Sequence, residues 1–398
     1  MNILIYIPNI SKKQGGIYQY TIALLNVLSK NASHDYYIFS GLKNKEIRAL
    51  VNQVDNFHTI PSKACFDSRV KERLYGLFRR ISSFNKLFKI NFHELMAVNR
   101  CIRKYNIDLT HCPYDYIPIE VSSPWISTIH DLQELLFPEY FTPHQRIDRA
   151  IARERIVNNS AHLICSYEHI KKDIAFYFPS VAGMISPILL SMESLWINQL
   201  DSSNLSYPDF LSEGTPFLLY PAATWKHKNH ERLLRAFVKV RDISPHIFLV
   251  CTGHKTEHWN FISELIDELD LRESVIFPGV VDDAVLFSLY HRCTAVVIPT
   301  LYEAGSFPLM ESLLCGIPVI CSRVTSLPET IGNEDFTFDA ENESDIARAI
   351  IQICENKELR EESSLNSGKQ RKKIIDNGSI DKILDVYELI GKKGNVRS

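Results

Sequence analysis

Short apolar runs alternate with amphipathic helical patterns along nearly the whole chain of 398 residues. This alternation favours parallel sheets, because two parallel neighbouring strands need a crossover connection, usually a helix. In the first half, strands are predicted at residues 3–7, 36–40, 108–112, 125–129 and 162–165. Helices are predicted between them, for example at 17–28 and 145–158. The chain is therefore predicted to be an α/β protein with helix-covered parallel sheets.

The second half repeats the pattern more regularly. Strands are predicted at 217–220, 247–252, 275–278, 295–299, 319–321 and 336–338. Helices are predicted at 231–240, 261–269, 284–291, 309–315 and 346–353, and a further helix at 380–390 follows a charged tail at 357–373. Ligands of such sheets bind beyond the carboxyl ends of the strands. We therefore look for chemistry in the loops after Pro221, Gly253, Gly279 and Thr300.

Composition limits the classes of protein that remain. A formal net charge of −3 excludes a generally basic nucleic-acid binder, so no nucleic-acid partner is expected. The 9 cysteines are scattered without a C-x-x-C pair, which favours free buried thiols in a reducing compartment. The chain starts directly as a strand without a signal-peptide pattern, and no apolar run approaches a membrane span. We expect a cytoplasmic protein, soluble or peripheral to a membrane.

Two glutamates flank the start of a predicted helix in the second half. The segment reads Glu303-Ala-Gly-Ser-Phe-Pro-Leu-Met-Glu311, followed by Cys-Gly-Ile-Pro-Val-Ile. Pro308 is tolerated in the first helical turn, and the free N–H groups and dipole of a helix start favour an anion such as a diphosphate. Carboxylates here can accept hydrogen bonds from sugar hydroxyls. On spacing alone, a surface cap and a solvated helix residue are an equally good interpretation.

Three further motifs lie at strand ends or at a helix start. Lys226 and Lys228 follow the strand 217–220, and a lysine there can stabilise a departing diphosphate without a metal. His130 and Asp131 follow the strand 125–129. Gly15 and Gly16 open the first helix, where glycines allow a ligand to approach the backbone closely. The alternatives are a solvated basic turn, a structural His-Asp pair and an ordinary Gly-Gly turn.

Taken together, these motifs resemble the E-x7-E glycosyltransferases of family 4, which carry E-G-F-G-L-P-x-x-E-A where this chain has E-A-G-S-F-P-L-M-E-S. Phe277-x-Gly279, Val281 to Asp283 and Ser326 to Glu329 agree with the same family. The resemblance implies the GT-B fold: two Rossmann-like domains with parallel sheets facing across a cleft. The acceptor domain is expected at 1–200, a Ser/Pro/Gly-containing linker at 201–216 and the nucleotide-sugar domain at 217–375. The helix at 376–398 is expected to pack back toward the first domain.

The resemblance also implies a role for each motif residue. Glu303 contacts hydroxyls of the donor sugar and Glu311 contacts the ribose. Backbone amides around Ser306 and Phe307, next to Pro308, hold the diphosphate. The remaining roles fall to Lys228 on the leaving group, His130 on the donor sugar, Asp131 on the sugar or acceptor, and Gly15 and Gly16 near the donor phosphates. An arginine common in the family is absent after the strand at 217–220, and Lys226 is the candidate replacement.

The implied reaction is a retaining hexosyl transfer from a nucleotide sugar, GDP- or UDP-linked, with mannose a common donor sugar in the family. The acceptor is expected to be a glycan or a lipid-linked glycan of bacterial surface polysaccharide. Neither an Asp-x-Asp motif nor a metal-spaced His/Cys cluster is present, so no metal and no cofactor are expected. The alternatives are a non-catalytic partner subunit that kept the fold, or a sugar phosphorylase or epimerase of the same fold.

A basic amphipathic stretch at 69–92 belongs to none of these motifs. Seven lysines and arginines accompany a single acid there, and apolar residues recur at helical spacing. Such a helix can lie on an anionic membrane surface, where lipid-linked acceptors are found. The alternative is that its apolar side packs into the first domain.

Overall fold

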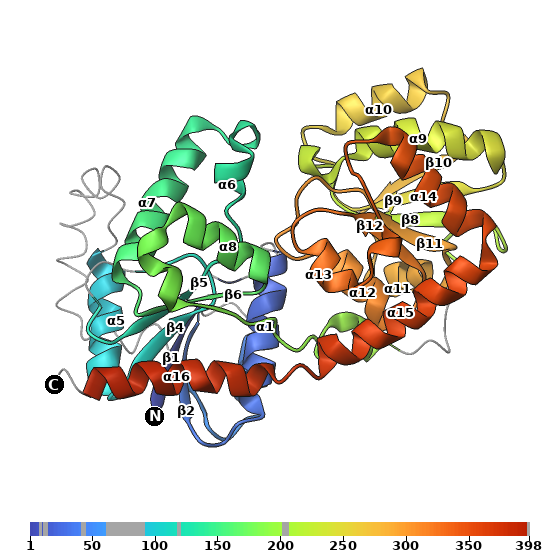
Figure 1. Cartoon of the computed structure of the whole chain (residues 1–398). Coiled ribbons are helices and arrows are strands. Elements are labelled where there is room, and N and C mark those ends of the chain that lie inside the picture. The colour runs from blue at the N-terminus through green and yellow to red at the C-terminus, as the bar shows by residue number, and fades with distance from the viewer. Residues whose placement is uncertain are drawn as a thin grey trace, which may run out of the picture. The chain divides into compact units, whose positions relative to one another are not determined.

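The computed structural model describes residues 1–7, 10, 15–40, 45–60, 92–117, 121–200 and 207–395. The basic stretch 69–92 lies outside these residues, apart from its last position. The chain forms two compact units (Figure 1). Unit 1 consists of Met1–Ser191 and Gly378–Ser398, and unit 2 of Met192–Asn377. The described part of the expected linker, 207–216, lies within unit 2, and the last helix lies within unit 1.

Unit 1 is built on a seven-stranded parallel sheet in the order β3-β2-β1-β4-β5-β6-β7. The strands are β1 Asn2–Ile7, β2 Asp35–Ser40, β3 Phe57–Ile60, β4 Leu109–Cys112, β5 Trp125–Thr128, β6 His162–Cys165 and β7 Ile185–Pro187. The chain runs from β1 outward to β3 and then returns to the other side with β4. The order therefore reverses between β1 and β4, and loops diverge there at the carboxyl ends.

The α-helices that the structure describes in unit 1 are α1 Gly16–Ser29, α2 Lys45–Val51, α5 Phe92–Lys104, α6 Gln133–Leu136, α7 Pro143–Asn159, α8 Glu168–Tyr177 and α16 Ser379–Asn395. A capping box between Thr142 and Gln145 starts α7, with Pro143 in the first turn, as its fixed φ allows. The middle of β1 is apolar: the side chains of Ile3, Leu4 and Ile5 are fully buried. That burial on both faces explains the unbroken apolar run of β1.

Unit 2 contains a six-stranded parallel sheet in the order β10-β9-β8-β11-β12-β13. The strands are β8 Phe217–Pro221, β9 Phe248–Thr252, β10 Val275–Gly279, β11 Ala295–Ile298, β12 Val319–Ser322 and β13 Thr337–Phe338. All six were predicted. Here the order reverses between β8 and β11, so the loops after these two strands are the expected place for a ligand.

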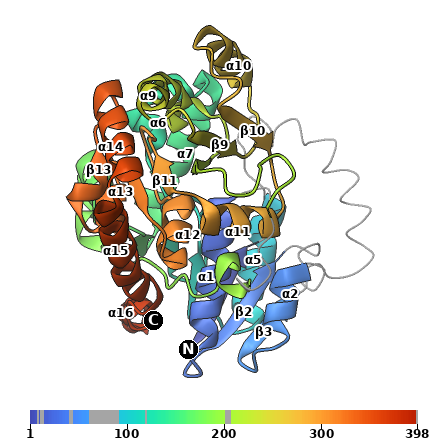
Figure 2. The same ribbon diagram turned by 90° about the vertical axis from the view of Figure 1, so that its right-hand side faces the viewer.

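Seven α-helices are described in unit 2: α9 His230–Ile243, α10 Trp259–Glu268, α11 Asp283–Arg292, α12 Phe307–Cys315, α13 Leu327–Ile331, α14 Glu343–Glu355 and α15 Lys357–Ile375. Gly316, with φ of 71°, ends α12 in the left-handed conformation that glycine adopts without strain. The charged tail predicted at 357–373 is the helix α15, which packs against α12 and α13 (Figures 1 and 2).

The cysteines follow the sequence prediction with one correction. Among the cysteines that the structure describes, seven are free: Cys112, Cys165, Cys251, Cys293, Cys315, Cys321 and Cys354. The prediction of free thiols is wrong for Cys101, which is disulfide-bonded. A disulfide requires two α-carbons within about 7 Å, and that approach is set by the tertiary fold rather than by spacing along the chain.

Candidate functional site

The loops after β8 and β11 bring two predicted residues of unit 2 into contact. Lys228 Nζ lies 2.5 Å from Glu303 Oε1. The two side chains are only 17% and 10% exposed, so water screens this ion pair weakly. The backbones of the loops are also joined, because Leu301 N and Thr300 Oγ1 donate to the carbonyl of His227 at 2.8 and 3.0 Å.

Asn229 fixes the backbone directly after Lys228. It adopts the left-handed conformation with φ of 61°, one of the few non-glycine positions in this region of the Ramachandran plot. Its buried side-chain amide donates to the carbonyls of Pro299 and Ala340, both at 2.8 Å. Tyr220 Oη donates to the Lys228 carbonyl at 2.7 Å. Lys228 therefore projects from a turn that is anchored on both sides.

Glu303 is held by its main chain in a comparable way. Its N–H donates to Thr325 Oγ1 at 3.1 Å, while Thr325 and Ser326 hydroxyls donate to its carbonyl at 2.6 and 3.1 Å. Its carboxylate accepts a hydrogen bond from Lys228. The carboxylate is thus held through one flexible lysine, whereas its backbone is rigid.

The start of α12 follows Glu303 directly. Ser306 is the N-cap, and its buried hydroxyl accepts from Leu309 N at 3.4 Å. Phe307 and Pro308 form the first turn. The helix start carries the positive end of the helix dipole, so it suits an anion next to Lys228.

Glu311 lies one turn inside α12, in a different environment from Glu303. Its Oε1 accepts from Trp196 Nε1 at 2.8 Å and its Oε2 from Tyr290 Oη at 2.7 Å. Burial raises the pKa of Glu311, although both hydrogen bonds act in the opposite direction. Each carboxylate oxygen can accept a second hydrogen bond, so the group is oriented by protein donors and still able to accept from a ligand.

The loops after β8, β9 and β10 meet around Gly253. Its φ is 125°, and a β-carbon there would lie 2.7 Å from the carbonyl carbon of Ala222. Its N–H donates to the Gly279 carbonyl at 2.8 Å. Lys226 is exposed. The pKa of His258, in the loop after β9, is lowered first by the partial burial of the imidazole and then by the positive charge of Lys226. Lys226 is therefore close to these loops.

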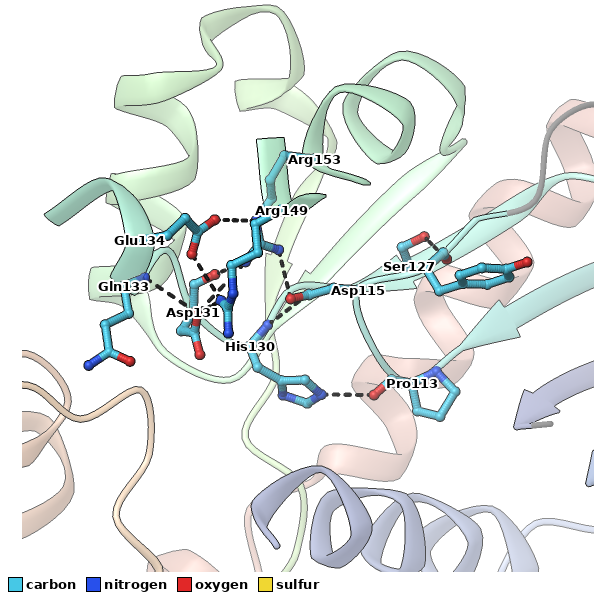
Figure 3. A network of polar contacts seen from close by, with 10 residues as sticks. Pro113, Asp115, Ser127, His130, Asp131, Gln133, Glu134, Arg149 and Arg153 are labelled. Atoms are coloured by element: carbon cyan, nitrogen blue, oxygen red, sulfur yellow. Dashed lines mark hydrogen bonds and ion pairs between the residues drawn. The ribbon is translucent and has the colours of Figure 1, made fainter. Parts of the chain in front are cut away.

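In unit 1, the predicted His130 lies two residues after the carboxyl end of β5. Its Nε2 lies 2.8 Å from the carbonyl oxygen of Pro113 (Figure 3). A carbonyl only accepts hydrogen bonds, so Nε2 carries the hydrogen and, in the neutral ring, Nδ1 carries the lone pair. The imidazole also packs edge-on against the ring of Tyr20, with 4.7 Å between centroids.

Gly15 and Gly16 form the start of α1, the helix that carries Tyr20. Gly15 is the N-cap, with φ of 53° and ψ of −116°, a conformation that favours glycine. Both glycines are exposed. The structure thus brings the start of α1 and His130 together within unit 1, through the contact between Tyr20 and the imidazole.

Asp131 belongs to a network that the sequence analysis missed (Figure 3). Arg149 Nη1 lies 3.0 Å from Asp131 Oδ1 and 2.9 Å from Glu134 Oε2. Arg153 pairs with Glu134 at 3.2 Å and with Asp115 at 2.8 Å. The two arginines lie four positions apart on one face of a helix that the sequence predicted. This spacing was the sequence signal that could have identified the network. Trp196 and Tyr290 were missed as well.

The described residues set two limits on the chemistry. Within the described ranges, no three His, Cys, Asp or Glu side chains are grouped to hold a metal ion. Along the same stretches, no helix combines the length and the apolar character needed to cross a membrane.

Comparison with known proteins places these features in a context. Residues 207–370 match the model of the family described as glycosyl transferases group 1. The O-antigen chain mannosyltransferase B of Escherichia coli is 25% identical over 346 residues, covering 85% of this chain and 88% of the relative. The O-antigen chain mannosyltransferase RfbU of Salmonella typhimurium is 22% identical, covering 88% and 90%.

Solved structures show the same fold. The Anabaena protein HepE, in complex with UDP and glucose, has a TM-score of 0.66 at 15% identity, covering 97% of this chain and 98% of that one. The chain therefore has the GT-B fold predicted from its sequence. Together, the family match and the relatives indicate a glycosyltransferase that transfers a hexose.

Proposed function

We propose that this glycosyltransferase belongs to the retaining, metal-independent E-x7-E enzymes of family 4 and takes a hexose from a nucleoside diphosphate sugar. The observation that carries the proposal is the partly buried ion pair between Lys228 and Glu303, beside the start of α12. It joins a cation for a diphosphate to a carboxylate for sugar hydroxyls at the point where the sheet order of unit 2 reverses.

Mannose is the proposed hexose and surface polysaccharide the proposed product class. The support is the similarity to two O-antigen chain mannosyltransferases over most of the chain. The acceptor is then a glycan or a lipid-linked glycan, and the reaction takes place in the cytoplasm or at the inner face of the plasma membrane. The donor is GDP- or UDP-linked; the structural neighbour that holds UDP and glucose supports a nucleotide sugar as co-substrate. No cofactor is part of the proposal.

In this proposal, the residues of unit 2 bind different parts of the donor. Lys228 and the backbone N–H groups around Ser306 and Phe307, next to Pro308, hold the diphosphate and stabilise the charge that grows on it as the sugar leaves. When Lys228 turns to the phosphate, Glu303 becomes available to the sugar hydroxyls. Glu311 accepts from the ribose, and Lys226 adds positive charge near the loops after β8 and β9.

In unit 1, His130 is proposed to position the donor sugar through Nδ1, and Asp131 to orient the sugar or the acceptor. Gly15 and Gly16 leave room for the donor phosphates at the start of α1. The reaction is proposed to be a same-face displacement, in which the departing phosphate assists the incoming acceptor hydroxyl. The anomeric configuration is then retained.

Binding of the donor is the first test. Thermal unfolding is followed with GDP, UDP, GDP-mannose and UDP-glucose in the presence of EDTA, for the wild type, Glu311→Gln and the matched surface variant Glu358→Gln on α15. A ligand at 100 times its Kd stabilises the native state by about 2.7 kcal/mol. We expect one nucleotide series to stabilise the wild type and Glu358→Gln, and Glu311→Gln far less. If no nucleotide stabilises the wild type, the proposal fails and a non-catalytic partner subunit is favoured.

The second test addresses turnover. Release of free nucleotide from the stabilising donor is measured with and without inorganic phosphate, and the anomeric configuration of the released sugar is read by NMR. We expect release that does not depend on phosphate, with the α configuration kept from an α-linked donor. Phosphate-dependent release would indicate a phosphorylase, and an inverted product would contradict the retaining mechanism.

A further inference from the structure

We infer that Arg153 is a positioning residue that fixes the ring of His130 and its tautomer. The inference rests on the proposed function in one respect: the ring so fixed is the one assigned to the donor sugar. The geometry of Arg153 itself is independent of that assignment.

Arg153 is buried in unit 1 and its guanidinium contacts three different segments. Its side chain is 3% exposed. Nη1 lies 2.8 Å from Asp115 Oδ2 in the loop after β4, and Nε lies 3.2 Å from Glu134 Oε1 on α6. Nη2 donates to the backbone carbonyl of Asp131 after β5. One side chain of α7 therefore joins the loops that follow two neighbouring strands (Figure 3).

Both of these loops hold His130. Its backbone N–H donates to Asp115 Oδ1 at 3.4 Å, so the carboxylate that pairs with Arg153 also contacts the histidine. Its ring nitrogen Nε2 is bonded to the carbonyl of Pro113, two positions before Asp115. The carbonyl of the next residue, Asp131, is held by Arg153 directly. Moving the guanidinium would release the backbone on both sides of the imidazole.

A lysine could not replace this arrangement. Three carboxylates, those of Asp115, Asp131 and Glu134, surround the guanidiniums of Arg149 and Arg153. Burial acts against the charge of Arg153, but the carboxylates outweigh it and raise its pKa. Arginine presents donors in a rigid planar fork, whereas the lysine ammonium is a single point on a flexible stem. Lysine would keep the charge and lose the connection between the loops.

The consequence for His130 is a defined protonation pattern. As long as the Pro113 carbonyl stays 2.8 Å from Nε2, the hydrogen of the neutral ring stays on Nε2 and the lone pair on Nδ1. If the loop of Asp115 moves away, this constraint is lost and both tautomers become populated. Only one of them presents an acceptor at Nδ1.

The test combines a spectroscopic and a kinetic readout on the full chain. The imidazole nitrogens are observed by 15N NMR, and the signal of His130 is assigned by its loss in His130→Gln. Arg153→Lys is compared with Arg146→Lys, an exposed arginine of the same helix. Asp115→Asn, at a side chain that is 29% exposed, is the second variant if Arg153→Lys does not fold.

We expect a single Nε2–H tautomer in the wild type and in Arg146→Lys, and averaged nitrogen shifts in Arg153→Lys. Donor turnover in Arg153→Lys should show kcat reduced by about 10- to 100-fold, as for a misplaced reacting group, with KM for the donor within about two-fold. Asp115→Asn should likewise average the nitrogen shifts of His130 and lower kcat, as Arg153→Lys does. A folded Arg153→Lys with an unchanged His130 spectrum would overturn the inference.

The outcomes separate this inference from the proposed function. If His130→Gln keeps full turnover, the assignment of His130 to the donor sugar is wrong, while the 15N spectra still decide whether Arg153 fixes the tautomer. If Arg153→Lys shows averaged shifts with an unchanged kcat, Arg153 orders the ring but is not a positioning residue for the reaction, and the inference fails in that part.

Discussion

Breaking the ion pair between Lys228 and Glu303 should separate stability from function. At 2.5 Å, two unit charges attract by about 7 kcal/mol at an effective dielectric constant of about 20, before the opposing cost of desolvation. Because the side chains are 17% and 10% exposed, removing one partner leaves the other largely shielded from water. We expect Lys228→Met to lower the free energy of unfolding by about 2–3 kcal/mol, below the 3–5 found for fully buried pairs.

The double variant Lys228→Met/Glu303→Gln provides the decisive comparison. It removes both charges, so most of the stability lost in Lys228→Met should return, with a coupling free energy of about 1–3 kcal/mol in a double-mutant cycle. Turnover should not return, because no cation remains for the departing diphosphate. A loss of about 100- to 1,000-fold in kcat is expected, as for other groups that stabilise a developing anion.

Urea unfolding and release of free nucleotide are the two assays, and exposed Lys239→Met on α9 is the matched control. The reasoning is refuted if the double variant regains wild-type turnover, since the pair would then be purely structural. It is also refuted if the two single variants destabilise additively, because additivity means that the two side chains do not interact in the folded protein.

Two further predictions concern buried polar groups. Glu311→Gln should keep or raise the free energy of unfolding at pH 7.5, because a Gln can accept from Trp196 and donate to Tyr290 without a buried charge. The same variant should bind the nucleotide at least 10-fold more weakly, because it lacks the carboxylate assigned to the ribose. Burial raises the pKa of Glu311, so the native state binds the proton of this carboxyl more tightly than the unfolded chain does. The wild type should therefore lose stability relative to Glu311→Gln as the pH rises from 4.5. Urea unfolding of both proteins at pH 5 and 7.5 measures this difference. Tyr387→Phe on α16 removes the partner, 2.7 Å away, of buried His111 Nδ1, and should cost about 1–3 kcal/mol in the free energy of unfolding. An unchanged urea midpoint of Tyr387→Phe would contradict the hydrogen bond between Tyr387 and His111.

The sequence predicted the interior strands of both sheets and the edge strands of the second sheet, but it missed the two edge strands of the first sheet. The fully buried β1 is a continuous apolar run, which is visible without a structure. The two strands missed, β3 and β7, lie at the two edges of the first sheet. In β3 the middle residues His58 and Thr59 are at least partly exposed, and β7 has three residues including Pro187. Edge strands need less apolar surface and tolerate proline, so hydrophobic periodicity identifies them poorly.

The partners of the candidate site residues were less predictable than the residues themselves. A position after a strand can be recognised from the sequence, as for Lys228, Glu303 and His130. Trp196, which donates to Glu311, lies 115 positions away in the chain. Arg153 contacts Asp115 from a different element. Such pairs depend on which loops the sheet order brings together, and no local pattern encodes that order.

The two glutamates of the E-x7-E segment show how one spacing creates two chemical environments. Glu303 precedes α12, where its side chain can reach a cation that follows another strand. Glu311 lies inside the helix, where its side chain is buried between an indole and a phenol that donate to it. A carboxylate facing a mobile cation can change partners when a charged ligand arrives, whereas one held by two neutral donors keeps its orientation. The first environment suits the part of a donor that leaves or reacts, and the second suits the part that must stay in place. A sugar nucleotide needs a carboxylate of each kind. Exchanging the surroundings of Glu303 and Glu311 should therefore reduce donor turnover more than removing either charge alone.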